Sequence, residues 1–324
     1  MDRVRIERRS SVGWPSPAVT IGDFDGVHVG HRALVAAAVE QARARDGTAV
    51  VLTFDPHPAR VLRPDRAPAA LTTLAQKEEL LAALGVDRLA VLPFDAALAA
   101  LDPEAFAREV LAGALGARHV VVGESFRFGR RRAGDAGTLV ALGARLGFEV
   151  QAMAPVLALG EAVSSSRVRE ALGRGDVRAA RAMLGRPYFV DAVVVRGAGR
   201  GRTIGVPTAN LEGDNEVLPE RGVYAARCRV PGRRWSGAVV NVGYRPTFDN
   251  GPLTVEAHLL DFDGDLYGAR VRLEFHDRVR GEQRFGGADA LVARIREDVA
   301  VARALLSSPG DDEVIVRSGD REPR

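Results

Sequence analysis

Short apolar runs alternate with longer amphipathic segments through the first half of the chain. The runs are rich in valine, as expected for strands buried on both faces, and they cover residues 18–21, 48–54, 88–94, 119–123 and 148–153. Between them, apolar residues recur at helical spacing. Strand and helix in alternation predict a doubly wound α/β fold, in which ligands bind beyond the carboxyl ends of the parallel strands.

Capping residues set the expected limits of the helices in this half. The first predicted helix covers residues 31–45, and the second runs from the capping box of Thr73 and Gln76 to just before Gly85. The third begins at Asp102 and Pro103, and the fourth covers residues 138–146.

The pattern changes after residue 186 to valine, arginine and threonine in alternation, with turn residues about every ten positions. Strands are expected at residues 188–196, 222–230, 233–243, 253–262 and 269–279, with a helix over 288–306. Five or six short strands and one helix predict a small closed barrel. We therefore expect a first domain at residues 1–185, a second at 186–306 and a disordered polar tail at 307–324.

Composition narrows the function classes. No apolar run approaches the roughly 20 residues that span a bilayer. The basic N-terminus lacks the apolar core of a secretory signal, so we expect a cytoplasmic protein without a membrane role. One cysteine, Cys228, excludes an internal disulfide and a thiolate metal cluster, and we expect it in a strand. The net charge of +3 does not demand nucleic acid, whereas a pI near 9.5 allows an anionic ligand. The only lysine, Lys77, follows Gln76, so the chain has no Walker A loop.

The segment TIGDFDGVHVGH, residues 20–31, follows the first buried strand. Its glycines at 22, 26 and 30 let backbone N–H groups approach an anion, and the following helix N-terminus adds partial positive charge. His28 and His31 can donate hydrogen bonds to phosphoryl oxygens. The loop predicts a phosphate cradle. The alternative is half of a zinc site, for which no third ligand with suitable spacing lies nearby.

A second polar segment, VSSSRVREAL at residues 163–172, ends the first half. Ser164, Ser165 and Arg167 offer hydroxyls and a bidentate guanidinium to a polyphosphate at a helix start. The alternative is that the serines are simple N-caps.

The second half holds two candidate segments. Residues 196–210 contain no GxGxxG fingerprint but form a glycine-rich flap that ends in PTAN, where Thr208 and Asn210 carry hard oxygen atoms suited to magnesium. Taken alone, PTAN is more often a turn. Glu256 lies between the apolar Val255 and Ala257, so it can face a ligand while its neighbours pack. A solvated strand residue is the alternative.

These segments together resemble a known family. TIGDFDGVHVGH, TFDPHP, VVGESFRFGRRRAG and VSSSRVRE are similar to the four motifs of the bacterial bifunctional riboflavin kinase/FAD synthetases. PTAN, GVYAA, NVGYRPTF and the VE(x)4LD pattern from Val255 to Asp261 resemble the kinase half. The resemblance covers almost the whole chain. It implies a Rossmann-like nucleotidyltransferase domain of the HxGH type, followed by a small antiparallel β-barrel riboflavin kinase domain with a C-terminal helix.

The resemblance also implies two reactions and their residues. Riboflavin and ATP give FMN in the barrel with Mg²⁺; FMN and ATP then give FAD and pyrophosphate in the first domain. The implied catalytic residues are Glu256, as the kinase base, and His28 and His31, which hold the ATP phosphates during attack by the FMN phosphate. The implied ATP-binding residues are Gly22, Asp23, Phe24, Gly30, Ser125, Ser164, Ser165 and Arg167. The implied flavin-binding residues are Pro56, His57, Pro58, Phe128 and Arg280. Thr208 and Asn210 are the implied magnesium ligands, and Gly197, Gly199, Gly201 and Pro207 belong to the kinase nucleotide flap.

One position departs from the family. Ser125 stands where the family usually has Asn or Asp, and its shorter side chain predicts slower adenylyl transfer or a different ATP position. Two competing functions remain. One is adenylyl transfer to another phosphorylated metabolite, and the other is an RNA-binding module. The barrel lacks aromatic residues clustered beside its basic ones, which argues against RNA binding. We expect no nucleic-acid partner, and a monomer or weak homo-oligomer.

Overall fold

A computed structural model describes residues 1–8, 10–197, 205–244, 253–283 and 285–307. The chain divides into two compact units, Met1–Ser164 and Ser165–Arg324. The predicted boundary at residue 185 stays a prediction, and the predicted disordered tail lies, apart from Ser307, outside the described residues.

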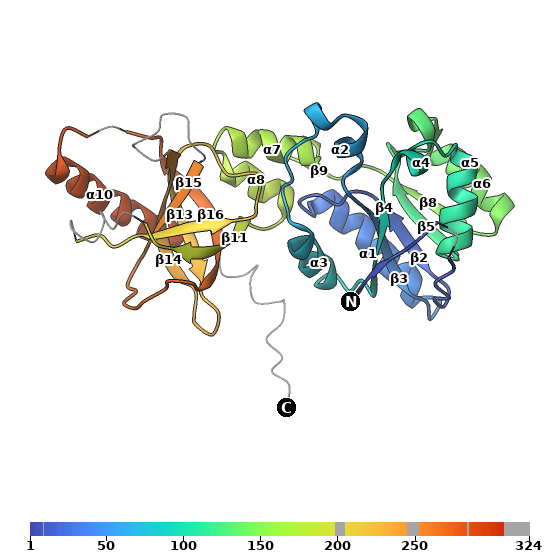
Figure 1. The fold of residues 1–324 in the computed structure, drawn as a ribbon, viewed down its shortest axis with the longest axis horizontal. Helices are drawn as coiled ribbons and strands as arrows, with labels where there is room; N and C mark the ends of the chain where they lie inside the picture. Colours follow the sequence, from blue (N-terminus) through green and yellow to red (C-terminus); the bar gives the residue numbers. More distant parts are fainter. Residues whose placement is uncertain (9, 198–204, 245–252, 284, 308–324) are drawn as a thin grey trace. The chain divides into compact units, whose positions relative to one another are not determined.

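The first unit is built on a six-stranded parallel sheet in the order β1-β4-β3-β2-β5-β8 (Figure 1). Its strands are β1 (Asp2–Arg5), β2 (Ala18–Ile21), β3 (Ala49–Asp55), β4 (Arg88–Pro93), β5 (His119–Gly123) and β8 (Glu149–Met153). The chain winds outward from β2 through β3 to β4, and then returns to place β5 on the other side of β2. The predicted doubly wound parallel sheet is confirmed, and its topological switch point lies between β2 and β5.

Strand β1 was not predicted from the sequence, in which the N-terminus is recognisable only as a basic segment. Asp2–Arg5 pairs in parallel with β4 at the sheet edge. Val4 packs against the core, whereas its charged neighbours are exposed and Arg3 lies 3.1 Å from Glu78. An edge strand with one half-buried apolar residue has no apolar run, so its composition does not predict a strand.

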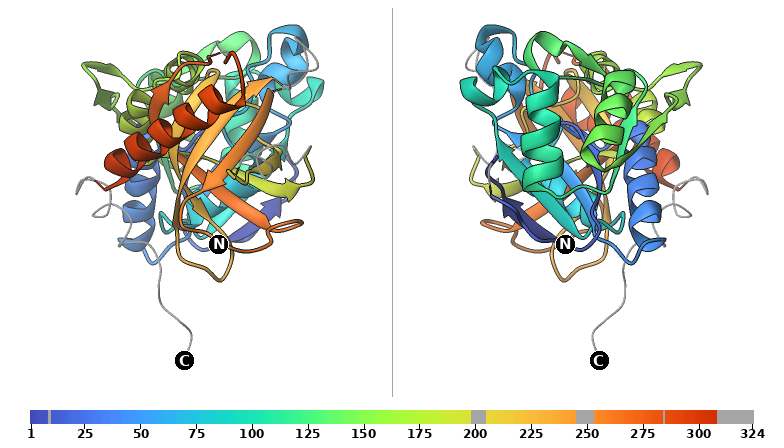
Figure 2. Two further views of the ribbon diagram at one scale, coloured as in Figure 1. Left: turned by 90° about the vertical axis from the view of Figure 1, so that its left-hand side faces the viewer. Right: turned by 90° about the vertical axis from the view of Figure 1, so that its right-hand side faces the viewer.

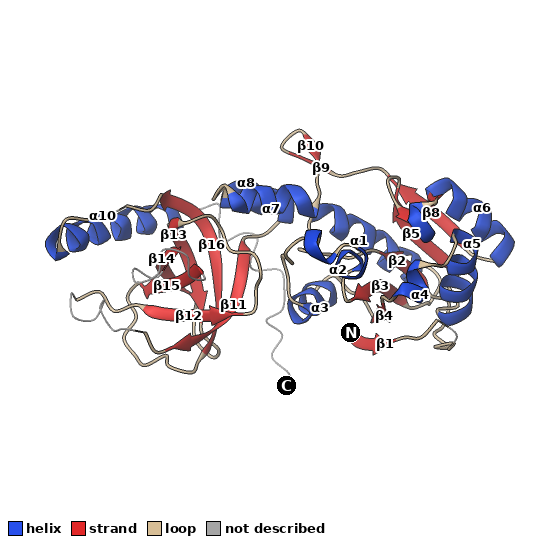
Figure 3. Ribbon diagram, turned by 45° about the horizontal axis from the view of Figure 1, so that its top comes forward, coloured by secondary structure: helices blue, strands red, loops and turns tan. Residues whose placement is uncertain are grey.

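Helices cover both faces of the sheet (Figure 3). Val51 of β3 packs in one cluster with Val35 of α1 (Val29–Arg43) and Leu81 of α3 (Leu74–Ala82). Its neighbour Leu52 packs in the other cluster with the π-helical segment η2 (Ala107–Ala114) and α6 (Ala136–Leu146). Successive strand residues point to opposite faces, so both faces are buried and the strands are apolar throughout.

Smaller elements complete the first unit. They are α2 (Pro58–Leu62), η1 (Pro64–Arg66), α4 (Ala96–Ala99), α5 (Pro103–Phe106), η3 (Arg130–Arg132) and the short strand pairs β6 (Arg127–Phe128) with β7 (Gly134–Asp135) and β9 (Leu157–Ala158) with β10 (Glu161–Ala162).

The predicted helix starts agree with the structure where a cap was recognised. Both hydrogen bonds of the Thr73 capping box are present, and Asp102 Oδ1 accepts from the Ala105 amide at 2.7 Å. Two helices begin two residues earlier than predicted, because their N-caps are His28 and Asp135. Histidine is not among the usual capping residues, so its role was not apparent.

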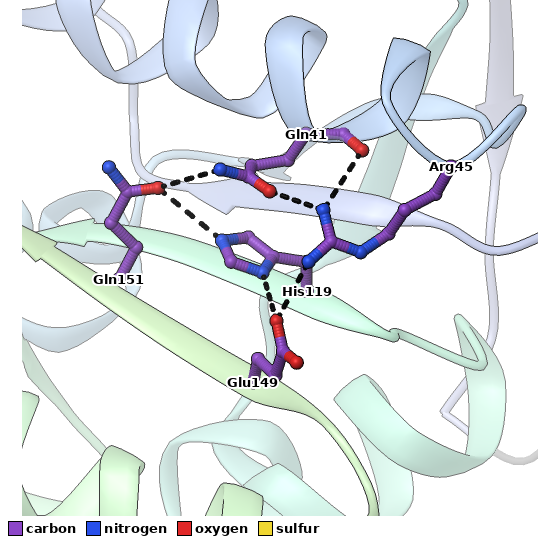
Figure 4. A network of polar contacts seen from close by, with 5 residues as sticks. All are labelled: Gln41, Arg45, His119, Glu149 and Gln151. Atoms are coloured by element: carbon purple, nitrogen blue, oxygen red, sulfur yellow. Dashed lines mark hydrogen bonds and ion pairs between the residues drawn. The ribbon is translucent and has the colours of Figure 1, made fainter.

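A polar network ties α1 to the edge of the sheet near the amino ends of β5 and β8 (Figure 4). The buried His119 ring lies between Glu149 Oε2, at 3.3 Å from Nδ1, and Gln151 Oε1, at 3.4 Å from Nε2. Gln41 donates to Gln151, and Arg45 donates to both Gln41 and Glu149. This end of the sheet is opposite the ligand-binding edge, so the network serves the fold.

The second unit begins with α7 (Ser165–Gly173) and α8 (Val177–Leu184), and α8 packs against β11 and β16. A closed barrel follows in the order β11-β12-β15-β14-β13-β16. Its strands are β11 (Tyr188–Val195), β12 (Ala209–Gly213), β13 (Gly222–Arg229), β14 (Ser236–Tyr244), β15 (Leu253–Leu259) and β16 (Arg270–Arg280). All six pairings are antiparallel, which confirms the predicted barrel.

Helix α10 (Ala288–Leu306) packs against β13, β14 and β16, as Figure 2 shows, and confirms the predicted terminal helix. Ala302 is buried against the barrel. Two ion pairs hold the helix. Arg303 binds both carboxylate oxygens of Asp261, and Arg280 Nη2 lies 2.8 Å from the buried Asp298.

One strand of the barrel was not predicted. Ala209–Gly213 forms β12, whereas the sequence alone favoured a turn for PTAN. Leu211 is its only buried side chain, so the segment lacks the alternation of a typical strand. Pairing with both β11 and β15 makes it a strand and closes the barrel. Cys228 is buried in β13, as expected.

Candidate active sites

Two of the predicted phosphate-site segments follow the strands that flank the topological switch point. The loop with His28 and His31 follows β2, and the segment with Ser125 follows β5. The DPHP segment follows the neighbouring strand β3. Parallel strands end at the same edge, so one edge of the sheet carries all three segments. Ser125 is exposed there.

His28 is the N-cap of α1, and this role fixes its tautomer. Its Nδ1 accepts a hydrogen bond from the His31 amide at 3.2 Å. A neutral imidazole that accepts at Nδ1 carries its proton on Nε2, which is then a donor. Gly30 leaves room for this arrangement, because a Cβ at position 30 would lie 3.2 Å from the imidazole.

His31 stacks on His28 with ring centroids 3.6 Å apart and planes inclined by 14°. The buried ring of Phe24 lies 5.1 Å from the His31 ring, with the planes inclined by 54°. Within the described part of the chain, the buried Nδ1 of His31 has no hydrogen-bond partner. The His31 imidazole therefore packs against both the His28 and the Phe24 rings, and its buried Nδ1 has unused hydrogen-bonding capacity among the described residues.

Both imidazoles are neutral at pH 7. Burial lowers the pKa of His28 to about 4, against the opposing effect of the Asp25 carboxylate. Burial, followed by the electrostatic interactions with His28 and Lys77, holds the pKa of His31 well below its ordinary value. The pair therefore offers hydrogen-bond donors without fixed charge.

This arrangement predicts a pH-dependent stability of the first unit. Because the folded-state pKa of His28 lies below its unfolded value near 6.5, its contribution is fully present above about pH 6.5 and is lost as the pH falls toward 4. The shift corresponds to an upper limit on the order of 3 kcal/mol. Relative to the parent chain, His28→Asn should gain stability between pH 7 and pH 4.5, because asparagine does not titrate and keeps the N-cap.

The measurement is denaturant unfolding followed by Trp14 fluorescence in a Trp235→Phe background, so that only the first unit reports. A stability difference between His28→Asn and the parent that stays constant from pH 7 to pH 4.5 would contradict the assigned pKa.

Asp23 joins three segments of the first unit. His57 accepts from the Ala59 amide at Nδ1, so its Nε2 carries the proton, and this atom lies 3.3 Å from Asp23 Oδ2. The Asp23 carbonyl accepts from Lys77 Nζ at 2.6 Å and from Thr53 Oγ1 at 3.3 Å. The structure thus brings the predicted residues Asp23 and His57 together.

The other residues of this unit that the resemblance implies for ATP or flavin binding make contacts within the fold. Gly22 pairs its amide with Leu52, and Pro58 occupies the first turn of α2, two residues after Pro56. The buried ring of Phe128 packs against Phe106 and Phe126, at 5.8 and 5.5 Å. Flavin contact by Pro56, Pro58 and Phe128 stays a prediction.

The serine-arginine segment crosses from one unit to the other. Ser164 is the last residue of the first unit, and Ser165 is the first residue of α7 in the second. Arg167 lies in the first turn of that helix. The predicted helix start is therefore present, and phosphate binding by the segment stays a prediction.

In the barrel, Glu256 lies in one cross-strand row with two asparagines. It is the register partner of Asn210 on β12 and of Asn241 on β14. Directly paired residues point to the same face of a sheet, so the three side chains lie side by side. Val255 and Ala257 are buried while Glu256 is half-buried, as the alternation predicted.

The end of the flap meets this row. A Cβ on Gly197 would lie only 2.1 Å from Asn210 Nδ2, so any other residue at position 197 would displace the Asn210 side chain. Pro207 accepts a hydrogen bond from His258 Nδ1 at 2.8 Å, and the following Thr208 is exposed. Gly199 and Gly201 lie outside the described residues.

Arg280, an implied flavin-binding residue, is held by α10. Its Nε donates to Asp298 at 3.0 Å, and its Nη1 donates to the Gly281 carbonyl at 3.0 Å. In this structure the guanidinium fixes α10 on β16, and flavin contact by Arg280 stays a prediction.

Comparison with known proteins gives a family for each half. A family model for FAD synthetase matches residues 13–167, and one for riboflavin kinase matches residues 184–306. The bifunctional riboflavin kinase/FMN adenylyltransferase of Pseudomonas fluorescens is 41% identical over 308 residues, which cover 95% of this chain and 96% of the relative. That of Escherichia coli K12 is 39% identical over 288 residues, which cover 89% and 92%. The chain belongs to the bifunctional riboflavin kinase/FMN adenylyltransferase family.

Both parts of that name have their own structural counterpart in the chain. The FAD synthetase match contains β2 to β10, and the riboflavin kinase match contains the whole barrel and α10. A crystal structure of a macrolide-efflux protein from Streptococcus pneumoniae is also similar, with a TM-score of 0.86 at 32% identity over 94% of this chain and 99% of that one. No helix in the described ranges is long and apolar enough to cross a membrane. The predicted activities, riboflavin kinase and FMN adenylyltransferase, are confirmed by the family.

Four residues near the sites of this bifunctional enzyme were not recognised from the sequence. Asn241 lies two strands from PTAN along the barrel and His258 lies one strand from it, so only the strand register reveals them. The buried Asp25 accepts from the amides of Leu71 and Thr72 at 3.0 and 3.1 Å.

Lys77 is the fourth of these residues. From the sequence, it was used only to exclude a Walker A loop. Its position in a charged side of α3, beside two glutamates, is typical of a solvated residue. A single lysine in an arginine-rich chain was the one available signal.

Proposed function

We propose that the loop after β2 binds the phosphates of ATP and that the first unit transfers the adenylyl group to FMN. The neutral Nε2–H of His28 donates to a phosphoryl oxygen, and His31 adds a second polar contact. As the FMN phosphate attacks the α-phosphorus, pyrophosphate leaves and these donors stabilise the charge that grows on the phosphoryl oxygens. The N-cap geometry of His28 carries this assignment. Ser164, Ser165 and Arg167 are proposed to hold the β- and γ-phosphates.

For the barrel we propose that Glu256 is the base of the riboflavin kinase reaction. It accepts the proton of the ribityl hydroxyl as that oxygen attacks the γ-phosphorus of ATP, and ADP leaves. The row of Asn210, Glu256 and Asn241 supports this role, since two flanking amides can hold a carboxylate in a fixed orientation.

The residues around Glu256 also suit a magnesium ion. Thr208 is exposed and Asn210 lies beside Glu256, and within the described ranges no cluster of three acidic, cysteine or histidine side chains could hold a metal. Magnesium usually takes few protein ligands and completes its shell with substrate phosphates and water. We propose that Thr208 and Asn210 hold Mg²⁺, which when bound neutralises phosphate charge.

The two-step assignment predicts a time course. With riboflavin, ATP and Mg²⁺, the purified chain should first form FMN and then FAD, because the product of the barrel is the substrate of the first unit. Chromatography that separates riboflavin, FMN and FAD measures both steps in one reaction.

Two parallel reactions supply the controls. Chelation of Mg²⁺ should prevent FMN formation. Faster adenylyl transfer to pantetheine phosphate or nicotinamide mononucleotide than to FMN would favour the competing adenylyltransferase function instead.

We further propose that the protein is cytoplasmic and is a monomer or weak homo-oligomer.

A further inference from the structure

Lys77 reaches from α3 into the loop that carries the two histidines. Its Nζ donates to the Asp23 carbonyl at 2.6 Å, and the ammonium end is largely removed from water. Burial lowers the pKa of Lys77, while the carboxylates of Asp25, Asp23 and Asp55 oppose that effect and favour the charged form. A cation taken out of water costs free energy unless such partners surround it.

The loop that Lys77 holds has a strained backbone. Phe24 and Val27 have φ values of 48° and 42°, in the left-handed region that bulky and β-branched side chains avoid. Strain of this kind costs about 1–3 kcal/mol per residue and persists only where the surroundings enforce it. The Asp23 carbonyl belongs to the peptide group immediately before Phe24, so the ammonium holds the chain where it enters the strained turn.

Other contacts fix the same loop but bring no positive charge to it. Thr53 Oγ1 donates to the Asp23 carbonyl at 3.3 Å, and the Gly26 amide donates to Thr72 Oγ1 at 3.1 Å. The Asp25 carboxylate is occupied by the backbone amides that precede α3. Lys77 both orders the loop and brings a positive charge near His31, whose pKa it helps to lower.

We propose that Lys77 is a positioning residue for adenylyl transfer: it holds the loop after β2 in its strained form through the Asp23 carbonyl and places its positive charge near His31. The titratable groups that interact with it are Asp23 and Asp25 from that loop, Asp55 from the end of β3, and His31. This inference rests on the proposed role of His28 and His31.

The test compares Lys77→Met, which keeps the length of the side chain without its charge, with Lys77→Arg, which keeps a charge. Loss of the contact lets the loop relax, and a misplacement of about 1 Å can cost roughly 100-fold in rate. We expect Lys77→Met to lower kcat/KM for FMN to FAD by about 10- to 100-fold. Lys77→Arg should retain more of the rate. Riboflavin to FMN should not change in either variant.

A second readout separates the charge from simple packing. The imidazole pKa of His31, followed by NMR, should rise in Lys77→Met because a neighbouring cation is removed. Thr53→Val is the matched control: it removes the longer hydrogen bond to the same carbonyl but no charge, so it should leave the pKa of His31 unchanged and slow FAD formation only slightly.

Unchanged FAD formation in Lys77→Met would overturn the inference, as would a loss of rate with an unchanged pKa of His31. If Lys77→Met fails to fold, the rate of FAD formation and the pKa of His31 can still be measured in Lys77→Arg and Thr53→Val. Equal pKa values for His31 in Lys77→Arg and the parent then support a role for the positive charge at position 77. Loss of FAD formation in His28→Asn with full activity in Lys77→Met would remove only Lys77 from the mechanism. Full activity in His28→Asn would remove the proposed function itself.

Discussion

Replacement of His28 by asparagine should leave the first unit folded and slow FMN to FAD conversion by about 10²- to 10³-fold, the usual cost of one donor to a developing oxyanion. Asparagine is among the best N-caps, so its side-chain oxygen can accept the His31 amide in place of His28 Nδ1. What the variant lacks is the Nε2–H that we propose donates to a phosphoryl oxygen of ATP. The rate of FAD formation from supplied FMN and ATP measures the effect.

His28→Ala provides the comparison that separates capping from chemistry. It loses both the cap and the donor, so it should be less stable than His28→Asn by about 0.5–2 kcal/mol but equally slow in FAD formation. Riboflavin to FMN conversion should be normal in both, because the barrel lies in the other unit. A His28→Asn chain that makes FAD at the parent rate would refute the phosphate contact.

The sequence predicted most elements because their signals are local. The capping box of Thr73 and Gln76 and the valine runs of the parallel strands each lie within a few residues, and each was found. Strands β1 and β12 were missed for the opposite reason. Each has a single apolar residue facing the core and becomes a strand only because partner strands satisfy its backbone groups.

The candidate sites divide in the same way. His28, His31 and Glu256 stand out because their neighbours along the chain mark them, as glycines or as alternating apolar residues. Lys77 is 54 residues from Asp23 in the chain, and Asn241 is paired with Glu256 only by the barrel register. Contacts of this kind depend on tertiary packing, which no local pattern encodes.

Replacement of Glu256 by glutamine should abolish most FMN formation. Glutamine has nearly the same shape and can still lie between Asn210 and Asn241, but its amide cannot take the proton of the ribityl hydroxyl. General base catalysis contributes about 10²- to 10⁴-fold, and we expect the loss of kcat to fall in that range. Because the side-chain volume is kept, binding of riboflavin should change little. The measurement is FMN formation from riboflavin, ATP and Mg²⁺.

Glu212→Gln on β12 is the matched control, since it removes an exposed carboxylate from a strand of the same barrel. It should leave FMN formation unchanged. FAD formation from supplied FMN should be unaffected in both variants, because the FAD synthetase match covers residues 13–167 and not the barrel. Loss of both reactions in Glu256→Gln would show that the carboxylate maintains the fold, and retention of FMN formation would show that another group accepts the proton. The decisive result is therefore a variant that converts FMN to FAD but cannot make FMN.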